Sequence, residues 1–548
     1  MSRRRVLAAL VALAACSAHG VDGHHDTPEE TGTRLVVLLV IDQWPEWSFE
    51  HKLPAFHGGG FSRLLAEGEW HVGYQPSAAT LTAPGHALFG TGEPPSGTGI
   101  LANEWWHRDL GKMLKAVQAD DGSVTAAWLE APALGDSIAA AHSGAKAVAV
   151  SLKDRASILP LGRHGTAIWL DGATHAWTAF GALPAWLAEW NRSHPPIATA
   201  PWTPLDAARL AQLAGVPDDH PGEVGEHGFG TTFPHDPGAT PHPDMALFAM
   251  PAGDQVVLDT ALAAIHGDGL GTDRTPDLLV VSLSAHDYVG HGWGHESWEM
   301  WDLELRLDQQ LGAFMAALDQ ATGAGRWAMI VTSDYGASPL PETLHGGRLT
   351  FDQIRSAANT AAAAVLGPGT WIDNAHYPNV YFSKAMLAQP KGELESATKR
   401  VIYALRSFPG IEEVGTVADV AGHCETRTGR SLALCLTFDP GRSGDVYYLP
   451  AKGWILEDAD EPEATGHGSL HDYDQQVPVI LLAPGRKPHA PQSRPAGEPI
   501  DLVEIAPLLA RWLGVTPPAS LPRPAPEPDL SSGPGSAGPP APPAPPPP

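Results

Sequence analysis

The sequence has 548 residues, with 34 Lys and Arg against 62 Asp and Glu, so its net charge is −28 when histidine is neutral. This length rules out a small disulfide-stapled module, and 43% apolar with 18% charged residues excludes wholesale disorder. The negative charge argues against nucleic acid as the main partner and predicts no nucleic-acid-binding surface, because phosphate backbones bind basic faces. Three cysteines are too few for a disulfide framework.

The first residues predict an export signal. Arginines at positions 3–5 precede an apolar run over 6–15, which is too short to span a bilayer as a mature helix. The run ends in Leu-Ala-Ala-Cys16, which resembles a bacterial lipobox. That resemblance implies a signal peptide over 1–16, a lipid anchor at Cys16 and a protein of the bacterial periplasm or outer membrane. An ordinary secretory signal that contains a cysteine is the alternative.

Five short apolar runs predict buried strands, and their continuous character is typical of parallel sheets. The runs span residues 35–41, 147–152, 278–283, 328–333 and 477–482, and Pro478 predicts an edge or strand-start position in the last run. Apolar residues recur at helical spacing over 298–319 and 502–513. This alternation predicts an α/β fold with a mostly parallel central sheet flanked by helices.

The chain divides by composition into a folded body and two polar ends. We expect a tether over 17–33, a folded domain over 34–516 and a disordered Pro-rich tail over 517–548. A stretch over about 156–270, rich in Trp, Pro, Gly and His, predicts an insertion over the sheet edge that shapes the substrate pocket. A second insertion over about 350–460 predicts a small α+β subdomain.

Two cysteines remain after Cys16, and both lie in this second insertion. Cys424 and Cys435 are close in sequence, in a chain that is expected to reach an oxidising compartment. We therefore predict a local disulfide between them, with two unpaired buried thiols as the alternative.

Charged side chains follow four of the predicted strands: Asp42, Lys153 with Arg155, Asp287, and Asp334. Ligands of open α/β sheets bind beyond the carboxyl ends of the strands, so these groups predict a site. His291 stands four residues after Asp287 and shares its face if the segment is helical, while His467 lies in a Gly-His-Gly loop. Mixed Asp and His ligands suit Zn²⁺, and two such ions can clamp both oxygens in phosphoryl transfer. Scattered surface histidines are the alternative, since the chain contains 26.

Thr82 is the candidate nucleophile. It opens the segment Thr82-Ala-Pro-Gly-His, in which the proline favours the start of a helix. A helix N-terminus attracts anions, and a hydroxyl bound to a metal ion there ionises more easily and can attack phosphorus. The alternative is that Thr82 simply caps the helix.

Together these segments resemble the alkaline phosphatase superfamily. The best match is its branch with a threonine nucleophile, which contains the type I phosphodiesterase/nucleotide pyrophosphatases and the PafA-like alkaline phosphatases. The resemblance runs from about residue 35 to 513 and implies a small phosphoester substrate, attack by Thr82 and phosphate binding by Asn103. It further implies two zinc ions, with these ligands: Asp287, His291 and His467 for one, and Asp42, Thr82, Asp334 and the residue after Asp334 for the other.

Lys153 and Arg155 indicate the substrate class. They are similar to the Lys-x-Arg signature of PafA-like phosphomonoesterases. A monoester carries about two negative charges and exposed oxygens, which a lysine and an arginine fork can bind, whereas a diester gains less. We therefore predict a metal-dependent phosphate monoester hydrolase that acts through a phospho-threonine, with a solvated strand-end cation pair as the alternative for these two residues.

The sequence departs from this family at Tyr335. The family reads Ser-Asp-His-Gly, with the histidine as a zinc ligand, whereas this chain reads Ser-Asp334-Tyr335-Gly. Tyr335 could bind as a phenolate, a water or a nearby histidine such as His86 or His345 could fill the place, or the second metal site is weak. Two alternative functions follow: a phosphodiesterase or nucleotide pyrophosphatase on the same metals, and a weakly active or non-catalytic phosphate-binding lipoprotein. The oligomeric state is left open.

Overall fold

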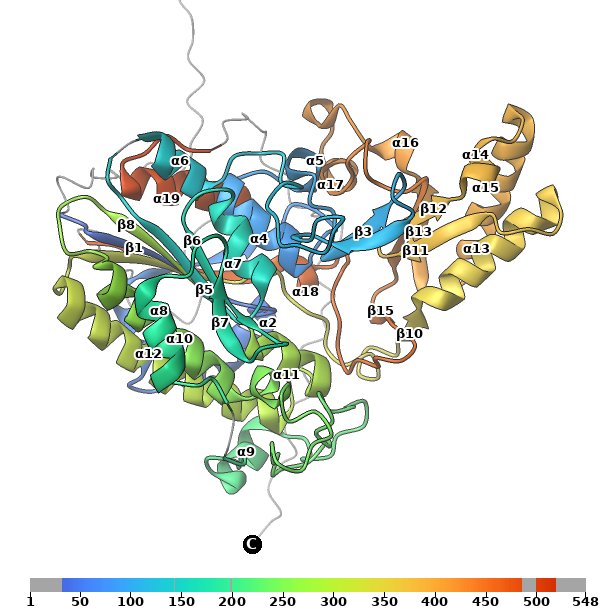
Figure 1. The fold of residues 1–548 in the computed structure, drawn as a ribbon. Coiled ribbons are helices and arrows are strands. Elements are labelled where there is room, and N and C mark those ends of the chain that lie inside the picture. The colour runs from blue at the N-terminus through green and yellow to red at the C-terminus, as the bar shows by residue number, and fades with distance from the viewer. Residues whose placement is uncertain (1–31, 142, 198–199, 485–498, 519–548) are drawn as a thin grey trace, which may run out of the picture.

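The computed structural model describes residues 32–141, 143–197, 200–484 and 499–518. Its centre is a nine-stranded sheet in the order β17-β2-β16-β9-β1-β8-β5-β6-β7. Figure 1 labels β1, β5, β6, β7 and β8 of this sheet. Five consecutive strands run parallel: β9 (Trp327–Thr332), β1 (Leu35–Ile41), β8 (Asp277–Leu283), β5 (Ala147–Ser151) and β6 (Thr166–Asp171). The predicted α/β class and the mostly parallel central sheet are therefore confirmed.

The strand that contains Pro478 lies inside the sheet. β16 (Gln476–Leu482) runs antiparallel between β9 and β2 (Glu69–Tyr74), so the predicted edge position is wrong. Pro478 pairs with Val72 of β2, whereas pairing with β9 begins only at Val479. The missing N–H of the proline therefore falls before the point where both neighbours are present, and the strand-start position is correct. The outer strands are β17 (Ile500–Asp501) and β7 (Ala176–Ala179).

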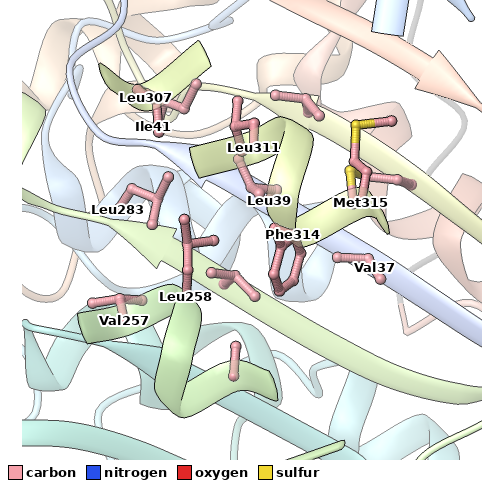
Figure 2. Close-up of a cluster of buried hydrophobic side chains, with 14 of the residues drawn as sticks. Val37, Leu39, Ile41, Val257, Leu258, Leu283, Leu307, Leu311, Phe314 and Met315 are labelled. Carbon is pink, nitrogen blue, oxygen red and sulfur yellow. The ribbon is translucent and has the colours of Figure 1, made fainter. Parts of the chain in front are cut away.

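Helices cover both faces of the sheet because its central strands are apolar on both sides. In β1, Val37, Leu39 and Ile41 point to one face, where they meet α10 (Pro251–Asp268) and α12 (Trp298–Thr322) (Figure 2). The alternate residues belong to the core of the other face. That face is covered by four helices: α4 (Thr82–Thr91), α6 (Leu134–Ala141), α7 (Asp154–Leu161) and α19 (Ile505–Leu513).

Both predicted helices are present. The pattern over 298–319 becomes α12, and that over 502–513 becomes the short η4 (Leu502–Glu504) followed by α19. No helix within the described ranges has the length and apolar character needed to cross a membrane. The predicted signal, the lipidation site at Cys16, and most of the tether and of the Pro-rich tail lie outside the described residues.

The expected insertion over 156–270 is too long. Its first part supplies α7 and the strands β6 and β7, and its last part supplies α10, so both belong to the central layers. Only the middle part leaves the sheet, with α8 (Ala185–Ser193) packed on α10 and α9 (Ala207–Ala214) packed on α12. The strands β6 and β7 could not be distinguished in this Trp- and Pro-rich stretch, because their apolar content is similar to that of the segments around them.

The second insertion forms the predicted α+β subdomain, which projects from the central sheet in Figure 1. It has a core of its own around an antiparallel sheet of four strands: β11 (Ile372–His376), β12 (Asn379–Phe382), β14 (Val446–Pro450) and β13 (Ile411–Thr416). The helices α13 (Phe351–Leu366) and α15 (Lys391–Leu405) pack together beside this sheet. A disulfide joins Cys424 to Cys435 in this subdomain, as predicted.

The remaining elements are mostly short: α2 (Glu46–Lys52), η1 (Leu53–Ala55), α3 (Gly60–Glu67), α5 (Pro95–Thr98), β3 (Glu104–His107), β4 (Lys112–Lys115), η2 (Ala246–Ala249), α11 (Ala285–Trp293), β10 (Gly347–Thr350), α14 (Lys384–Leu387), α16 (Val417–Val420), η3 (Cys424–Thr426), α17 (Gly429–Thr437), β15 (Trp454–Glu457) and α18 (Asp472–Gln475).

Candidate active site

The carboxyl ends of four neighbouring strands bring the predicted charged residues together. Asp42 directly follows β1, Asp334 follows β9 after one residue, and Lys153 follows β5 after one residue. β8 leads into α11, which carries Asp287 and His291. Because these strands are parallel neighbours, all of these side chains reach the same edge of the sheet.

Asp287, His291 and His467 form a compact set of metal-binding atoms, all within 4.8 Å of one another. The Nε2 atoms of the two imidazoles lie 3.4 Å apart. Each ring is oriented from its other nitrogen: His467 Nδ1 lies 2.6 Å from the carbonyl of Thr80, and His291 Nδ1 lies 3.1 Å from the carbonyl of Thr465. Both Nε2 lone pairs are thereby turned toward one point, which is the usual arrangement of histidine metal ligands.

The two histidines of this set differ in their electrostatics, because burial lowers the pKa of His291 but Glu463 and Asp287 outweigh burial and raise it well above its ordinary value. Burial, together with the charge of His291, lowers the pKa of His467 to about 4, so its imidazole is neutral as a metal ligand must be. Burial raises the pKa of Asp287, but Lys153 and His291 outweigh it and hold the pKa well below its usual range. The site therefore offers one carboxylate and two imidazoles, a donor set that fits zinc.

Thr82 is the first residue of α4 and does not cap it. The N-cap position belongs to Leu81, so the alternative of Thr82 as a capping residue is wrong. The Thr82 Oγ1 atom lies instead 3.0 Å from the hydroxyl of Tyr335. Asn103 lies beside it, since its Oδ1 accepts a hydrogen bond of 2.8 Å from the N–H of Ala83. That bond leaves the side-chain NH₂ of Asn103 as a donor for a bound ligand.

Lys153 and Arg155 are placed differently from each other. Lys153 Nζ is buried and lies 2.6 Å from Asp42 Oδ2 and 2.6 Å from Asp287 Oδ2. Its ammonium group is thus held between two carboxylates. Arg155 lies in the first turn of α7, where its Nε makes no hydrogen bond to any described residue. Of the two cations, Arg155 therefore has a donor, Nε, that is available to a bound ligand.

Tyr335 is fully buried at the centre of the site. Its hydroxyl lies 2.8 Å from Asp42 Oδ1 and 2.9 Å from Asp287 Oδ1, in addition to its contact with Thr82. Burial, with the charges of Asp287 and Asp42, raises the pKa of Tyr335 well above its ordinary value.

His86 does not take the place of the missing histidine ligand. Its Nδ1 donates to the carbonyl of Thr82 at 2.9 Å and lies 3.1 Å from Asp334 Oδ2, while its Nε2 lies 2.9 Å from Ser282 Oγ. Both ring nitrogens are therefore already paired. Burial, together with Asp42, raises the pKa of Asp334 to about 7.

Two residues of the site were not predicted. Gln43 donates from Nε2 to Asp287 Oδ1 at 3.0 Å and lies 3.0 Å from His291 Nε2, with its backbone in the left-handed region at φ 57°. Glu463 lies 3.2 Å from His291 Nδ1. Gln43 directly follows Asp42 at a strand end, which is a signal that could have identified it. Glu463 carries no such signal, because only the folded loop brings it to α11.

A cavity of about 250 Å³ adjoins the metal-binding set, and Asn103, His291 and His467 line it. Five acidic residues line the same cavity: Glu104, Glu457, Asp458, Glu461 and Glu463. Within the described part of the chain, none of its lining residues comes from 156–270. The subdomain and the loop that follows it form the wall instead.

Comparison with known proteins places these features in a family. The sequence model of type I phosphodiesterase/nucleotide pyrophosphatase matches residues 36–474. Alkaline phosphatase PafA of Elizabethkingia meningoseptica is 28% identical over 528 residues, covering 90% of this chain and 94% of PafA. Alkaline phosphatase PhoK of a Sphingomonas species is 30% identical over 521 residues, covering 88% of each chain. The crystal structure of wild-type PafA superposes with a TM-score of 0.79 at 27% identity, covering 88% of this chain and 96% of the other.

These alkaline phosphatase relatives, together with the Asp287, His291 and His467 set, imply that the protein uses a divalent metal. The family match over 36–474 covers the parallel strands of the sheet and every residue of the candidate site, whereas β16, β17 and α19 lie beyond it. The chain belongs to the type I phosphodiesterase/nucleotide pyrophosphatase family, as a PafA-like member of the alkaline phosphatase superfamily, and is a phosphoric ester hydrolase.

Proposed function

We propose that this protein is a metal-dependent phosphate monoester hydrolase in which Thr82 is the nucleophile. One observation carries the proposal: the Thr82 hydroxyl, at the start of α4, lies 3.0 Å from the Tyr335 hydroxyl, which also contacts Asp42 and the Asp287 member of the Asp287, His291 and His467 set. A nucleophilic hydroxyl, a helix N-terminus and a set of metal ligands thus meet at one point. The comparisons support ester hydrolysis in general, and this geometry supports its assignment to Thr82.

The proposed reaction has two displacements at phosphorus. Asn103 and Arg155 donate hydrogen bonds to the phosphoryl oxygens and orient the ester. The Thr82 hydroxyl loses its proton to solvent, and the Thr82 Oγ–P bond forms as the bond from phosphorus to the leaving alcohol breaks. The alcohol oxygen departs with the electron pair and is protonated by solvent. Water then attacks the phospho-threonine, releases inorganic phosphate and restores the Thr82 hydroxyl. Zinc held by Asp287, His291 and His467 would stabilise negative charge on the phosphoryl oxygens and lower the pKa of bound water.

Replacement of the nucleophile tests this mechanism. We expect Thr82→Ala to lower kcat for an aryl phosphate by about 10³-fold or more, because no group remains to form the covalent intermediate. Thr82→Ser is the matched control, since it keeps a hydroxyl, and it should retain measurable turnover and accept phosphate in an acid-quench experiment. Full activity in Thr82→Ala would exclude Thr82 as the nucleophile.

The family model also favours a second function, a phosphodiesterase, and charge separates the two. A monoester carries about one more negative charge than its methyl diester, so it gains more from two cations. We expect Lys153→Ala to lower kcat/KM for the monoester by more than for the methyl diester with the same aryl leaving group. Lys146→Ala, which removes a lysine that binds the backbone of Asp268, is the control. Equal losses on both substrates would favour the diesterase.

A further inference from the structure

The place of a second metal ion is taken by protein atoms. The family pattern assigns that ion to Asp42, Thr82, Asp334 and the residue at position 335, and a zinc ion needs its ligands at about 2.0–2.2 Å. In this chain the hydroxyl oxygen of Tyr335 stands among those groups, at 2.8 Å from Asp42 Oδ1 and 3.0 Å from Thr82 Oγ1. The phenol oxygen thus contacts two of the candidate ligands, Asp42 and Thr82.

Lys153 takes the remaining carboxylate oxygens. Its Nζ lies 2.6 Å from Asp42 Oδ2 and 2.6 Å from Asp287 Oδ2, while the Tyr335 hydroxyl contacts the Oδ1 atom of each. Both oxygens of Asp42 and both oxygens of Asp287 therefore have partners. The second site differs in that the Tyr335 hydroxyl contacts Asp42 and Thr82, and a dication between those two residues would have to displace it.

Tyr335 is not free to turn away. Its ring is fully buried, with its centroid 4.1 Å from that of His467. Its backbone is held on both sides, because Ser333 Oγ donates to the Tyr335 carbonyl at 2.8 Å and the Gly336 N–H donates to the Asp474 carbonyl at 2.8 Å. The backbone at Gly336 packs so closely against the Tyr473 carbonyl that a side chain at position 336 would collide with it.

We propose that the chain holds one divalent ion, at Asp287, His291 and His467, and that the Tyr335 hydroxyl takes the place of the second ion of the family. Lys153 then supplies fixed positive charge beside the nucleophile, and Tyr335 holds Asp42 and the Thr82 hydroxyl in place. This inference rests on the proposed function for its meaning in catalysis, but the number of ions does not depend on turnover.

The test counts metal ions in the purified full-length protein after loading with zinc and removal of excess zinc. Inductively coupled plasma mass spectrometry should give one zinc per chain for the wild type and two for Tyr335→His, which restores an imidazole at the expected ligand position. Tyr335→Phe, which keeps the ring but adds no ligand, should keep one. His467→Ala should lose the wild-type ion, because it removes a member of the first set.

Two results would overturn the proposal: two zinc ions in the wild type, or a count that stays at one in a folded Tyr335→His protein. Circular dichroism establishes whether each variant is folded, and the wild-type count decides the matter even if Tyr335→His fails to fold. A Thr82→Ala protein that keeps turnover would refute the proposed mechanism and leave the ion count as it is. The two failures are therefore separable.

Discussion

At the scale of single residues, the metal-binding set depends on partners that are not ligands. His291 has its Nδ1 within 3.1 Å of the Thr465 carbonyl and 3.2 Å of Glu463 Oε2. Burial opposes a charge on His291, but Glu463 and Asp287 raise its pKa well above the ordinary value. A carboxylate behind a histidine ligand orients the ring and increases its basicity, so Glu463 should strengthen metal binding.

Removing that carboxylate is the corresponding prediction. We expect Glu463→Gln to weaken zinc binding by about tenfold, because outer partners of histidine ligands are worth about 10- to 100-fold in affinity. Competition with a chromophoric chelator measures the dissociation constant. Glu461→Gln is the matched control, since Glu461 lines the same cavity. Equal affinities for the two variants would show that the Thr465 carbonyl alone orients His291.

The sequence was sufficient to predict residues whose position follows from one strand end or one helix turn. Asp42 and Asp334 sit at ends of buried apolar runs, and the four-residue spacing of Asp287 and His291 predicted their shared helix face. The partners of Lys153 could not be predicted, because they depend on the distances between three strands of the sheet.

At the scale of elements, the parallel centre of the sheet was predictable and its margins were not. Continuous apolar runs mark β1, β5, β8 and β9, since strands buried on both faces need apolar residues at every position. The inner place of β16 could not be read from its residues, because it depends on the pairing of β2 with its outer side. The place of β6 and β7 in the central sheet likewise depends on strand pairing, so the sequence predicts an insertion there instead.

Helix α10 carries a buried acid that makes stability depend on pH. Asp254 is fully buried, and burial raises its pKa to about 7 from 3.8. Its Oδ1 accepts a hydrogen bond from the N–H of Ala285 at 3.1 Å, and its Oδ2 has no partner among the described residues. Between about pH 4 and 7 the folded protein keeps a proton that the unfolded chain has lost. Stability therefore falls as pH rises through this window.

Asp254→Asn should remove this dependence, because the amide keeps the acceptor for Ala285 and cannot ionise. We expect the variant to gain about 2 kcal/mol or more in free energy of unfolding at pH 8, with little change at pH 4, since one pKa unit corresponds to about 1.4 kcal/mol. Urea denaturation of the metal-loaded protein at both pH values measures the gain. Asp259→Asn changes an exposed acid on the same helix and is the control. A gain of equal size at both pH values would contradict this account.

At the scale of the whole molecule, the charge of −28 acts on substrate encounter rather than on the bond that is broken. The cavity beside the metal-binding set has five acidic lining residues, and burial together with neighbouring acids raises the pKa values of Glu457, Asp458 and Glu461. These acids line the same cavity as Asn103, so a proposed anionic phosphoester that binds Asn103 lies close to them. The site cations therefore attract an anionic substrate only at short range, whereas the negative charge of the protein repels it over about one Debye length.

Salt should then speed the reaction of a dianionic substrate. Raising the ionic strength from about 0.01 to 0.15 M shortens the Debye length from about 30 to 8 Å, which screens the surface while leaving contacts inside the site largely intact. We expect kcat/KM for an aryl phosphate to rise by about twofold or more with little change in kcat. Choline phosphate, whose leaving group is cationic, should show a smaller rise, and Glu461→Gln should weaken the salt effect on the aryl ester. A kcat/KM that falls with salt would mean that the field of Lys153 and Arg155 reaches beyond the acidic wall and governs encounter.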